Sequence, residues 1–511
     1  MKEKRKRINR KWPCFLAVSL LLILIFLAAG KIKKGYHGDE FFTFILANHT
    51  YSDTNSIYVQ VKDETSYTGK ELWDEFLYVN DGNRFDYKNV WENQIHDVHP
   101  PLYYVIVHTV SSIFPGLSVK KTGIMVNALL GVVVFWQMVR IFELLRLKRR
   151  NAVILAAAFI MSCGFIDYAV MFIRMYALLA VWMNLLILVF LRYPPEDKSG
   201  TPYYLLFGAA LIGGMLTQYY FIIFAFFTCL LYAGYVIKNR NWKKLIASLA
   251  TAGISFLIAY LIFPSMIDHI FFGTRGQQAF ENVSSSGLIR NLWIFIDHIN
   301  VNIFGGLLVV LLAILFCLAI ILSGKNEKTD MYPGPLLIIP VILYVIVVAK
   351  IAPYQTLRYC ISCMGVLYAG VMGLLVGMAD RVSKTAYRYV LVLAILMLFT
   401  GYRKEPVNMY ADEEAKCSMI QKNAALPCAY IYDFQGYIML NYPELWYLND
   451  IVFVNAGKWE EEKSSITKEG SLLLFIDDKK TDMLAAVTEQ TGHTKSEYLF
   501  TSGHAKVYIL S

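Results

Sequence analysis

The chain contains a series of long apolar stretches separated by short polar segments. The first runs for 18 residues from Pro13 to Gly30, and others follow as far as about residue 401. A helix needs about 20 mainly apolar residues to cross the hydrocarbon core of a bilayer. With 57% hydrophobic and 17% charged residues, the chain also has too much apolar side chain for an ordinary soluble protein. The sequence therefore predicts a polytopic α-helical membrane protein.

Clusters of Lys and Arg indicate how the chain is oriented in the membrane. Seven of the first 11 residues are Lys or Arg, directly before the first apolar stretch. Because such residues concentrate on the cytoplasmic side, we expect a cytoplasmic N-terminus and an extracytoplasmic loop over residues 31–100. A cleaved signal peptide ending near Gly30 is the alternative. The many later apolar stretches favour a retained anchor.

Ten further membrane spans are expected after the first. They cover residues 122–141, 151–170, 174–192, 202–216, 218–237, 244–263, 303–323, 334–350, 358–378 and 386–401. Basic clusters at 146–150, 238–244, 325–328 and 381–388 all fall on the cytoplasmic side only if the apolar segment 102–114 does not fully cross. The prediction is about 11 transmembrane helices, within a range of 11 to 13, with segment 102–114 at the outer surface or re-entrant.

The composition changes after the last predicted span. Residues 402–511 alternate polar stretches with short strand-like runs such as 451–454 and 471–476. About 110 residues can bury a small core, so a small extracytoplasmic α/β domain is expected here. Residues 1–401 form the predicted membrane domain, with external loops at 31–100 and 264–302.

The net charge of +9 could indicate a polyanionic partner such as nucleic acid. However, the basic residues lie mainly in short clusters between apolar stretches, where they orient helices in a bilayer. We therefore expect the lipid bilayer as a partner and no nucleic acid.

The first polar stretch of interest is Gly38-Asp39-Glu40, directly after the first apolar span. An ionised carboxylate near the membrane is costly unless it is solvated, paired or functional. A functional carboxylate here could accept a proton from a hydroxyl group or bind a divalent metal. The ordinary alternative is an acidic pair in a solvated loop.

The second polar stretch runs from His96 through Asp97 and His99 into Pro100-Pro101. Consecutive prolines stiffen the entry to the next helix and fix its direction. A His-x-x-His spacing is only a weak metal signal, and two solvated histidines are the alternative. The metal ligands considered are Asp39, His96 and His99.

Together these stretches resemble the GT-C glycosyltransferases of the protein O-mannosyltransferase and aminoarabinose-transferase type, often grouped as family thirty-nine. The resemblance rests on Asp39-Glu40 after the first span and on Asp97-x-His99-Pro-Pro-Leu-Tyr-Tyr at the end of the first external loop. It extends over roughly residues 1–400, in the right order, and does not include the C-terminal domain.

Three later stretches continue the resemblance. Residues 172–178, Phe-Ile-Arg-Met-Tyr-Ala-Leu, are similar to an Ala-Arg-Met-Tyr-Ala-Leu stretch of bacterial members. Residues 217–220 are similar to their Thr-His-Tyr, but Gln218 stands where His is usual, which leaves the role of that side chain open. Residues 355–359 are similar to a late Arg-Tyr at an outer helix end.

The resemblance implies transfer of a single sugar from a polyprenyl-phosphate donor to an acceptor at the outer face of the cell membrane. The acceptor would be a lipid, a glycan or a protein of the cell envelope. Asp39 would be the general base on the acceptor hydroxyl, or a metal ligand, with Glu40 supporting it. His99 would contact the donor phosphate or help to hold a metal. A divalent metal stays open as a cofactor, because the O-mannosyltransferase branch acts without an obligatory one and other GT-C branches use one.

A phosphate leaving group needs cations, and Arg matches phosphate oxygens with a forked set of donors. The candidates are Arg174 with Tyr176, and Arg358 with Tyr359. The alternative for both Arg residues is snorkelling to lipid headgroups. For Arg275, in an external loop, surface solvation is favoured.

Three other functions remain open. A transporter would also place charged residues in a membrane cavity, but it predicts internal repeats or paired broken helices, and neither is evident. A polysaccharide polymerase or ligase would share the lipid-linked donor but depends on a large external loop elsewhere. A non-catalytic GT-C homologue is the third alternative.

Overall fold

The chain forms two compact units in the computed structural model, which describes residues 2–50, 61–63, 65–284, 286–323, 333–383, 385–403, 406–410, 412–468 and 470–511. The basic cluster at 325–328 lies outside the described residues. The helical unit comprises Met1–Gly30, Val98–Tyr103 and Gly123–Val407. The α/β unit comprises Lys31–Asp97, Tyr104–Thr122 and Asn408–Ser511.

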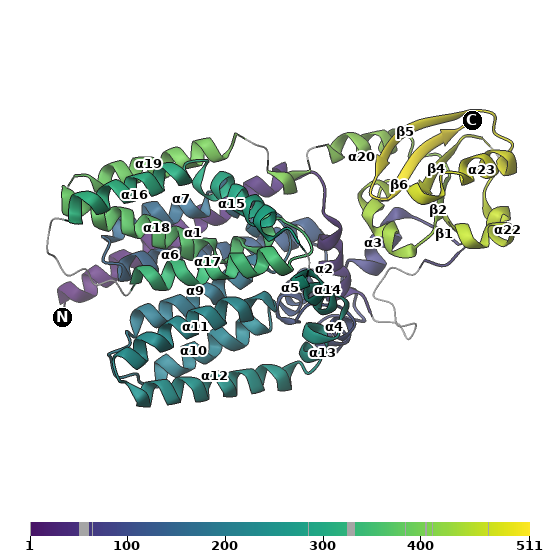
Figure 1. The fold of residues 1–511 in the computed structure, drawn as a ribbon. Coiled ribbons are helices and arrows are strands. Elements are labelled where there is room, and N and C mark those ends of the chain that lie inside the picture. Colours follow the sequence, from purple (N-terminus) through teal and green to yellow (C-terminus); the bar gives the residue numbers. More distant parts are fainter. Residues whose placement is uncertain are drawn as a thin grey trace. The chain divides into compact units, whose positions relative to one another are not determined.

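Long helices make up most of the helical unit (Figure 1). Its main helices are α1 (Lys2–Ile32), α6 (Val119–Leu144), α7 (Arg149–Ile160), α8 (Cys163–Phe165), α9 (Tyr176–Arg192), α10 (Thr201–Met215), α11 (Tyr220–Lys238), α12 (Trp242–Ile262), α13 (Met266–Phe271), α14 (Thr274–Ser284), α15 (Leu288–Phe304), α16 (Leu308–Ser323), α17 (Pro333–Ile351), α18 (Ile361–Val382) and α19 (Tyr387–Gly401). Two short irregular helices complete it, the π-helix η1 (Ile166–Met171) and the 3-10 helix η2 (Leu357–Tyr359).

Every stretch predicted as a span contains a helix. Among the described residues, 6 helices are long and apolar enough to cross a membrane, or up to 8 if each of two bent pairs is one span. Four shorter apolar helices accompany them, namely α5 (Leu102–Ile113), α9, α10 and α19. The protein is therefore a multi-pass membrane protein, and the count of 11 spans stays a prediction. At 12 residues α5 is about 18 Å long, shorter than the ~30 Å hydrocarbon core.

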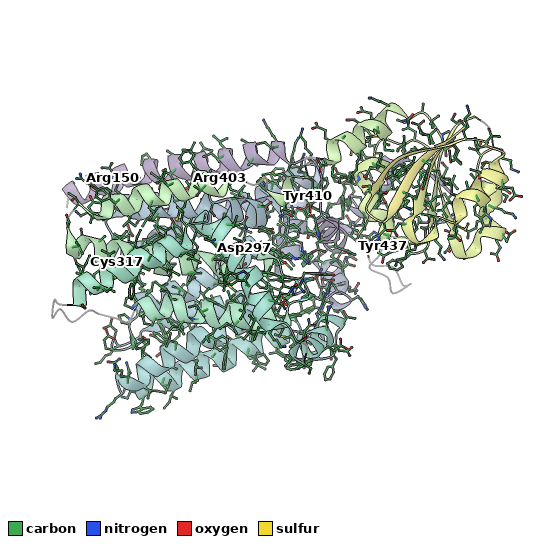
Figure 2. The ribbon with its side chains drawn as sticks, turned by 45° about the horizontal axis from the view of Figure 1, so that its top comes forward. Arg150, Asp297, Cys317, Arg403, Tyr410 and Tyr437 are labelled. Atoms are coloured by element: carbon green, nitrogen blue, oxygen red, sulfur yellow. The ribbon has the colours of Figure 1, made fainter. Side chains whose placement is uncertain are left out.

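Helix α16 illustrates a surface suited to lipid. Among its described residues Leu311 is the buried one, and the helix is apolar on all sides. The thiol of Cys317 on this helix is exposed (Figure 2). An exposed helix that is apolar all round is what a lipid environment stabilises.

The predicted second external loop, 264–302, is mostly helical. It contains α13, α14 and most of α15. Helices α15 and α16 meet at an angle of 82°, so the predicted span 303–323 begins later, at Leu308. Gly305 and Gly306 make this break with φ of 59° and 81°, a left-handed conformation that favours glycine.

The α/β unit contains a six-stranded sheet of order β1-β3-β2-β4-β6-β5. The strands are β1 (Ser66–Tyr67), β2 (Cys428–Tyr432), β3 (Ile451–Asn455), β4 (Leu472–Asp477), β5 (Ser496–Ser502) and β6 (Ala505–Leu510). Strands β3, β2 and β4 are parallel, and the other pairings are antiparallel. Strands β2 and β4 are buried along their whole length, as expected for central parallel strands.

Helices of this unit come from both ends of the chain. They are α2 (Gly38–Asn48), α3 (Gly69–Phe76), α4 (Tyr87–Ile95), α5, α20 (Glu413–Lys422), α21 (Tyr442–Leu445), α22 (Trp459–Glu462) and α23 (Met483–Thr491), with the 3-10 helix η4 (Gln435–Asn441). Val487 of α23 belongs to the apolar core that covers one face of the sheet.

The first external loop packs with the C-terminal residues rather than standing apart from them. Strand β1 pairs with β3, and the indole Nε1 of Trp73 donates to the Tyr442 carbonyl at 2.9 Å. A Cβ at Gly69 would lie 1.8 Å from the Leu445 carbonyl oxygen, so only glycine allows this approach. The compact units thus differ from the predicted division into 1–401 and 402–511. A two-residue strand has no sequence pattern that could have indicated this pairing.

Candidate active site

Asp39 and Glu40 occupy the first turn of α2, and the N-terminal end of a helix favours acidic side chains. His37 is the N-cap, and its Nδ1 accepts a hydrogen bond from the Asp39 N–H at 3.0 Å. Glu40 Oε2 in turn accepts from the His37 N–H at 2.7 Å. This reciprocal capping box fixes the start of α2 and therefore the place of Asp39.

Glu40 is fully buried and forms an ion pair. Its Oε2 accepts from Lys33 Nζ at 3.0 Å, and both side chains are 0% exposed. Lys33 Nζ also donates to the Asn408 carbonyl at 2.8 Å and lies 4.9 Å from the ring centre of Tyr410, a residue labelled in Figure 2. Glu40 is therefore part of the framework of the α/β unit.

Asp39 has a different environment from its neighbour. Its side chain is 36% exposed, and its Oδ2 lies 3.7 Å from His37 Nδ1. A carboxylate that is held on a capped helix start and yet open to solvent can meet a hydroxyl group of a substrate.

His99 and Arg174 come together within the helical unit, although 75 residues separate them in sequence. Arg174 Nη2 lies 3.2 Å from His99 Nε2, and Arg174 is only 4% exposed. A guanidinium group has only donors, so a hydrogen bond between them requires the imidazole nitrogen to accept. The Leu102 N–H donates to the Leu216 carbonyl at 3.0 Å, which fixes the chain just after Pro100-Pro101.

Arg358 lies among aromatic rings of the same unit. Its guanidinium is 5.1 Å from the ring centre of Tyr359 and 5.9 Å from that of Phe172. Arg358 Nη2 donates to the Tyr359 hydroxyl at 3.2 Å. The predicted motifs at 172–178 and 355–359 are thus adjacent in the fold.

Tyr176 and Tyr359 are buried and help to shape this region. Tyr176 stacks on Phe172 with ring centres 5.9 Å apart, and its carbonyl accepts from Ser362 Oγ at 2.9 Å. Tyr359 meets Tyr220 edge-on at 5.5 Å. These contacts hold the two Arg-bearing segments in place.

The predicted metal ligands fall in different units. Asp39 and the exposed His96 belong to the α/β unit, whereas His99 belongs to the helical unit. Within the described ranges, no group of three or more His, Cys, Asp or Glu side chains is placed to hold a metal ion. A metal role for these residues stays a prediction.

The two remaining motif residues are placed as follows. Gln218, which stands where His is usual, is buried in the helical unit. Arg275 is exposed and donates to Gln278 Oε1 at 2.8 Å, in keeping with the solvation expected for it.

Sequence reasoning missed two buried polar residues, one in each unit. Asn127 lies inside the apolar stretch 122–141 and is fully buried. A polar residue within a span indicates a functional site, so this signal was available. Lys33 lies in a basic run, where no pattern separates it from its neighbours.

The fold is similar to that of a solved aminoarabinose transferase, one of the two types of enzyme that the sequence resembles. The aminoarabinose transferase ArnT from Cupriavidus metallidurans, solved bound to undecaprenyl phosphate, aligns with a TM-score of 0.54 and 12% identity over 98% of each chain. ArnT in the apo state aligns with a TM-score of 0.47 and 13% identity over 98% of each chain. The oligosaccharyltransferase AglB from Archaeoglobus fulgidus aligns with a TM-score of 0.45 and 11% identity. The alignment covers 98% of this chain and 74% of the AglB chain. No protein-family model and no curated protein matches the sequence.

Proposed function

We propose that the protein transfers a single sugar from a polyprenyl-phosphate donor to an acceptor at the outer face of the cell membrane. The observation that carries this proposal is the contact of Arg174 with His99. It joins two motifs that are far apart in sequence and makes a cationic site for phosphate in a membrane protein. The GT-C fold supports the proposal, as does the undecaprenyl phosphate bound to the ArnT structure.

The reaction follows from the chemistry of these side chains. Asp39 accepts the proton of the acceptor hydroxyl, whose oxygen attacks the anomeric carbon of the sugar. The bond from that carbon to the phosphate oxygen breaks, and polyprenyl phosphate leaves with the bonding electrons. Arg174 and Arg358 stabilise the negative charge on the leaving phosphate, and His99 contacts the same group.

The remaining predicted residues have supporting roles. Glu40 holds Lys33 and the start of α2, which keeps Asp39 in place. Tyr176 and Tyr359 line the region around the two Arg residues and offer aromatic surface to the donor. The reaction as proposed does not depend on a metal, and a divalent ion bound by Asp39 is the alternative.

The orientation is also proposed. The basic clusters favour a cytoplasmic N-terminus, with residues 402–511 outside the cytoplasm. The acceptor is then a lipid, glycan or protein hydroxyl of the cell envelope.

Sugar release from radiolabelled polyprenyl-phosphate donors tests the function. We expect turnover by the wild type and a loss of at least about 100-fold in Asp39→Asn, because general base catalysis contributes about 10²–10⁴-fold. Asp74→Asn, at an exposed carboxylate of α3, is the matched control and should keep its activity.

The outcomes separate the alternatives. Equal turnover by wild type and Asp39→Asn would refute the assignment of Asp39. Inhibition by a chelator would favour the metal-ligand role over the general base. A wild type that is folded but inactive with a panel of donors and acceptors would favour a non-catalytic homologue.

A further inference from the structure

Asn127 makes an unusual set of hydrogen bonds in the middle of an apolar helix. It lies on α6 and is 0% exposed. Its Nδ2 donates to the carbonyls of Val170 at 3.2 Å and Phe172 at 3.0 Å. Its Oδ1 accepts from the Tyr103 hydroxyl at 2.9 Å. One buried amide thus connects three different segments of the helical unit.

These carbonyls need partners because the helix ends there. The π-helix η1 stops at Met171, and Phe172 is extended, with φ −78° and ψ 107°. A buried carbonyl that has no hydrogen-bond donor destabilises the fold. Asn127 donates to both carbonyls, and the Phe172 carbonyl also accepts from the Arg174 N–H. Irregular π-helical turns are also frequent at functional sites.

The segment that Asn127 holds carries Arg174. The Arg174 N–H donates to the Phe172 carbonyl at 2.8 Å, which is one of the two carbonyls bound by Asn127. The Arg174 side chain then reaches His99. Tyr103, at the other side of the amide, follows His99 by four residues on the same Pro-Pro segment. Asn127 therefore binds the backbone of the segment that carries Arg174 and the Tyr103 side chain of the segment that carries His99.

We propose that Asn127 is a positioning residue that sets Arg174 and His99 for the phosphate of a polyprenyl phosphate. This inference rests on the proposed function, since it assigns the Arg174 site to the donor phosphate. Asn127 itself contacts backbone and Tyr103, so it acts through Arg174 and not on the ligand.

The test measures selectivity for phosphate, which a general loss of structure does not produce. The purified full-length protein in detergent is titrated with a short-chain polyprenyl phosphate and with the polyprenol of the same length. The ratio of the two dissociation constants reports the phosphate site, because the tail is common to both probes. We expect the wild type to prefer the phosphate.

Asn127→Leu keeps the number of side-chain heavy atoms and their branching but removes every hydrogen bond of the amide. We expect the preference for phosphate to fall about tenfold, with binding of the polyprenol unchanged. Asn184→Leu is the matched control. Asn184 is also 0% exposed, on α9, and its amide atoms have no hydrogen-bond partner among the described residues. The preference of the Asn184→Leu variant for the phosphate should equal that of the wild type.

Tyr103→Phe provides a milder second variant in case Asn127→Leu does not fold. It removes the one hydroxyl that orients the amide, and we expect a twofold to threefold loss of selectivity. A double-variant cycle with Arg174→Ala tests the route of the effect. If Asn127 acts through Arg174, Asn127→Leu has no further effect on selectivity in the Arg174→Ala background.

Each outcome decides a different point. A wild type that binds phosphate and alcohol equally overturns the proposed donor and removes the basis of the inference with it. A selective wild type whose selectivity survives in Tyr103→Phe and in folded Asn127→Leu overturns the positioning role alone. An undiminished effect of Asn127→Leu when Arg174 and His99 are both replaced by Ala would also overturn it, because Asn127 would then act through neither side chain.

Discussion

At the residue scale, the adjacent carboxylates Asp39 and Glu40 lie in opposite environments. Asp39 is partly exposed, whereas Glu40 is buried and forms an ion pair with Lys33. Removing one partner of a buried ion pair leaves the other charge without compensation, which is far more costly than losing a surface pair. Glu40 and Lys33 should therefore matter for stability, and Asp39 for turnover.

Lys33→Met tests this difference. We expect the free energy of unfolding to fall by about 3–5 kcal/mol, because Glu40 would remain buried without its cation. Lys34→Met is the control, since Lys34 pairs with the exposed Glu414, and its loss should cost less than about 1 kcal/mol. Thermal unfolding in detergent measures both, and equal shifts for the two variants would contradict the argument.

Glu444 predicts a pH dependence of stability. The pKa of this carboxyl group is raised from 4.5 to about 7, mainly because the group is buried. The negative charge of Glu413 also raises the pKa, whereas the Ser502 hydroxyl and Lys416 lower it. The folded chain keeps the proton up to about pH 7, whereas the unfolded chain loses it above about pH 4.5. The contribution of Glu444 to the free energy of unfolding is therefore fully present below pH 4.5 and is lost as the pH rises through 7.

Glu444→Gln removes this titration. Between pH 4.5 and 8 we expect the wild type to lose up to about 3 kcal/mol more stability than the variant, at about 1.4 kcal/mol per pKa unit. Glu497→Gln, at an exposed carboxylate of β5, should behave as the wild type. Parallel pH profiles of melting temperature for wild type and Glu444→Gln would disprove the prediction.

At the element scale, hydropathy predicted where helices form but not where they bend. The predicted span 151–170 is broken after Ile160, with a 58° bend between α7 and the α8–η1 segment. Ser162 begins the second piece by accepting from the Phe165 N–H at 3.3 Å. A serine inside an apolar run does not distinguish such a cap from an ordinary helical position, so the bend could not be predicted.

The break between α15 and α16 gives a prediction at this scale. Gly305→Ala forces a side chain into φ 59° and places its Cβ 2.3 Å from the Met397 carbonyl oxygen. We expect a loss of about 1–3 kcal/mol in thermal unfolding. Gly253→Ala, in α12 with open space around its Cβ position, should be neutral or slightly stabilising. A tolerated Gly305→Ala would show that the break does not depend on glycine.

At the scale of the whole molecule, the sequence predicted a multi-pass helical protein, its GT-C resemblance and a C-terminal segment with strands. It did not predict that the first loop joins the sheet, because β1 has only two residues. The motifs carrying His99 and Arg174 were identified, but their 3.2 Å contact depends on helix packing that no local pattern encodes. The polar Asn127 inside an apolar stretch was a signal of a functional site, but the sequence does not show which carbonyls and hydroxyl it binds.

Membrane topology can be tested on the whole protein. Ser496→Cys on the exposed part of β5 should react with a membrane-impermeant maleimide in intact cells, because residues 402–511 are expected outside the cytoplasm. Lys243→Cys, in a basic cluster expected inside, should react only after lysis. Labelling is compared with that of the parent chain, whose exposed Cys317 lies on an apolar helix. The reverse pattern would invert the proposed orientation.

The pairing of β1 with β3 also has a consequence for biosynthesis. About 385 residues separate the two strands, so this pairing is highly non-local. The helices can insert one after another during synthesis, but the unit that carries Asp39 can assemble only when residues 408–511 have emerged. A nascent chain can therefore complete its apolar helices before the unit that carries Asp39, the proposed general base, becomes ordered.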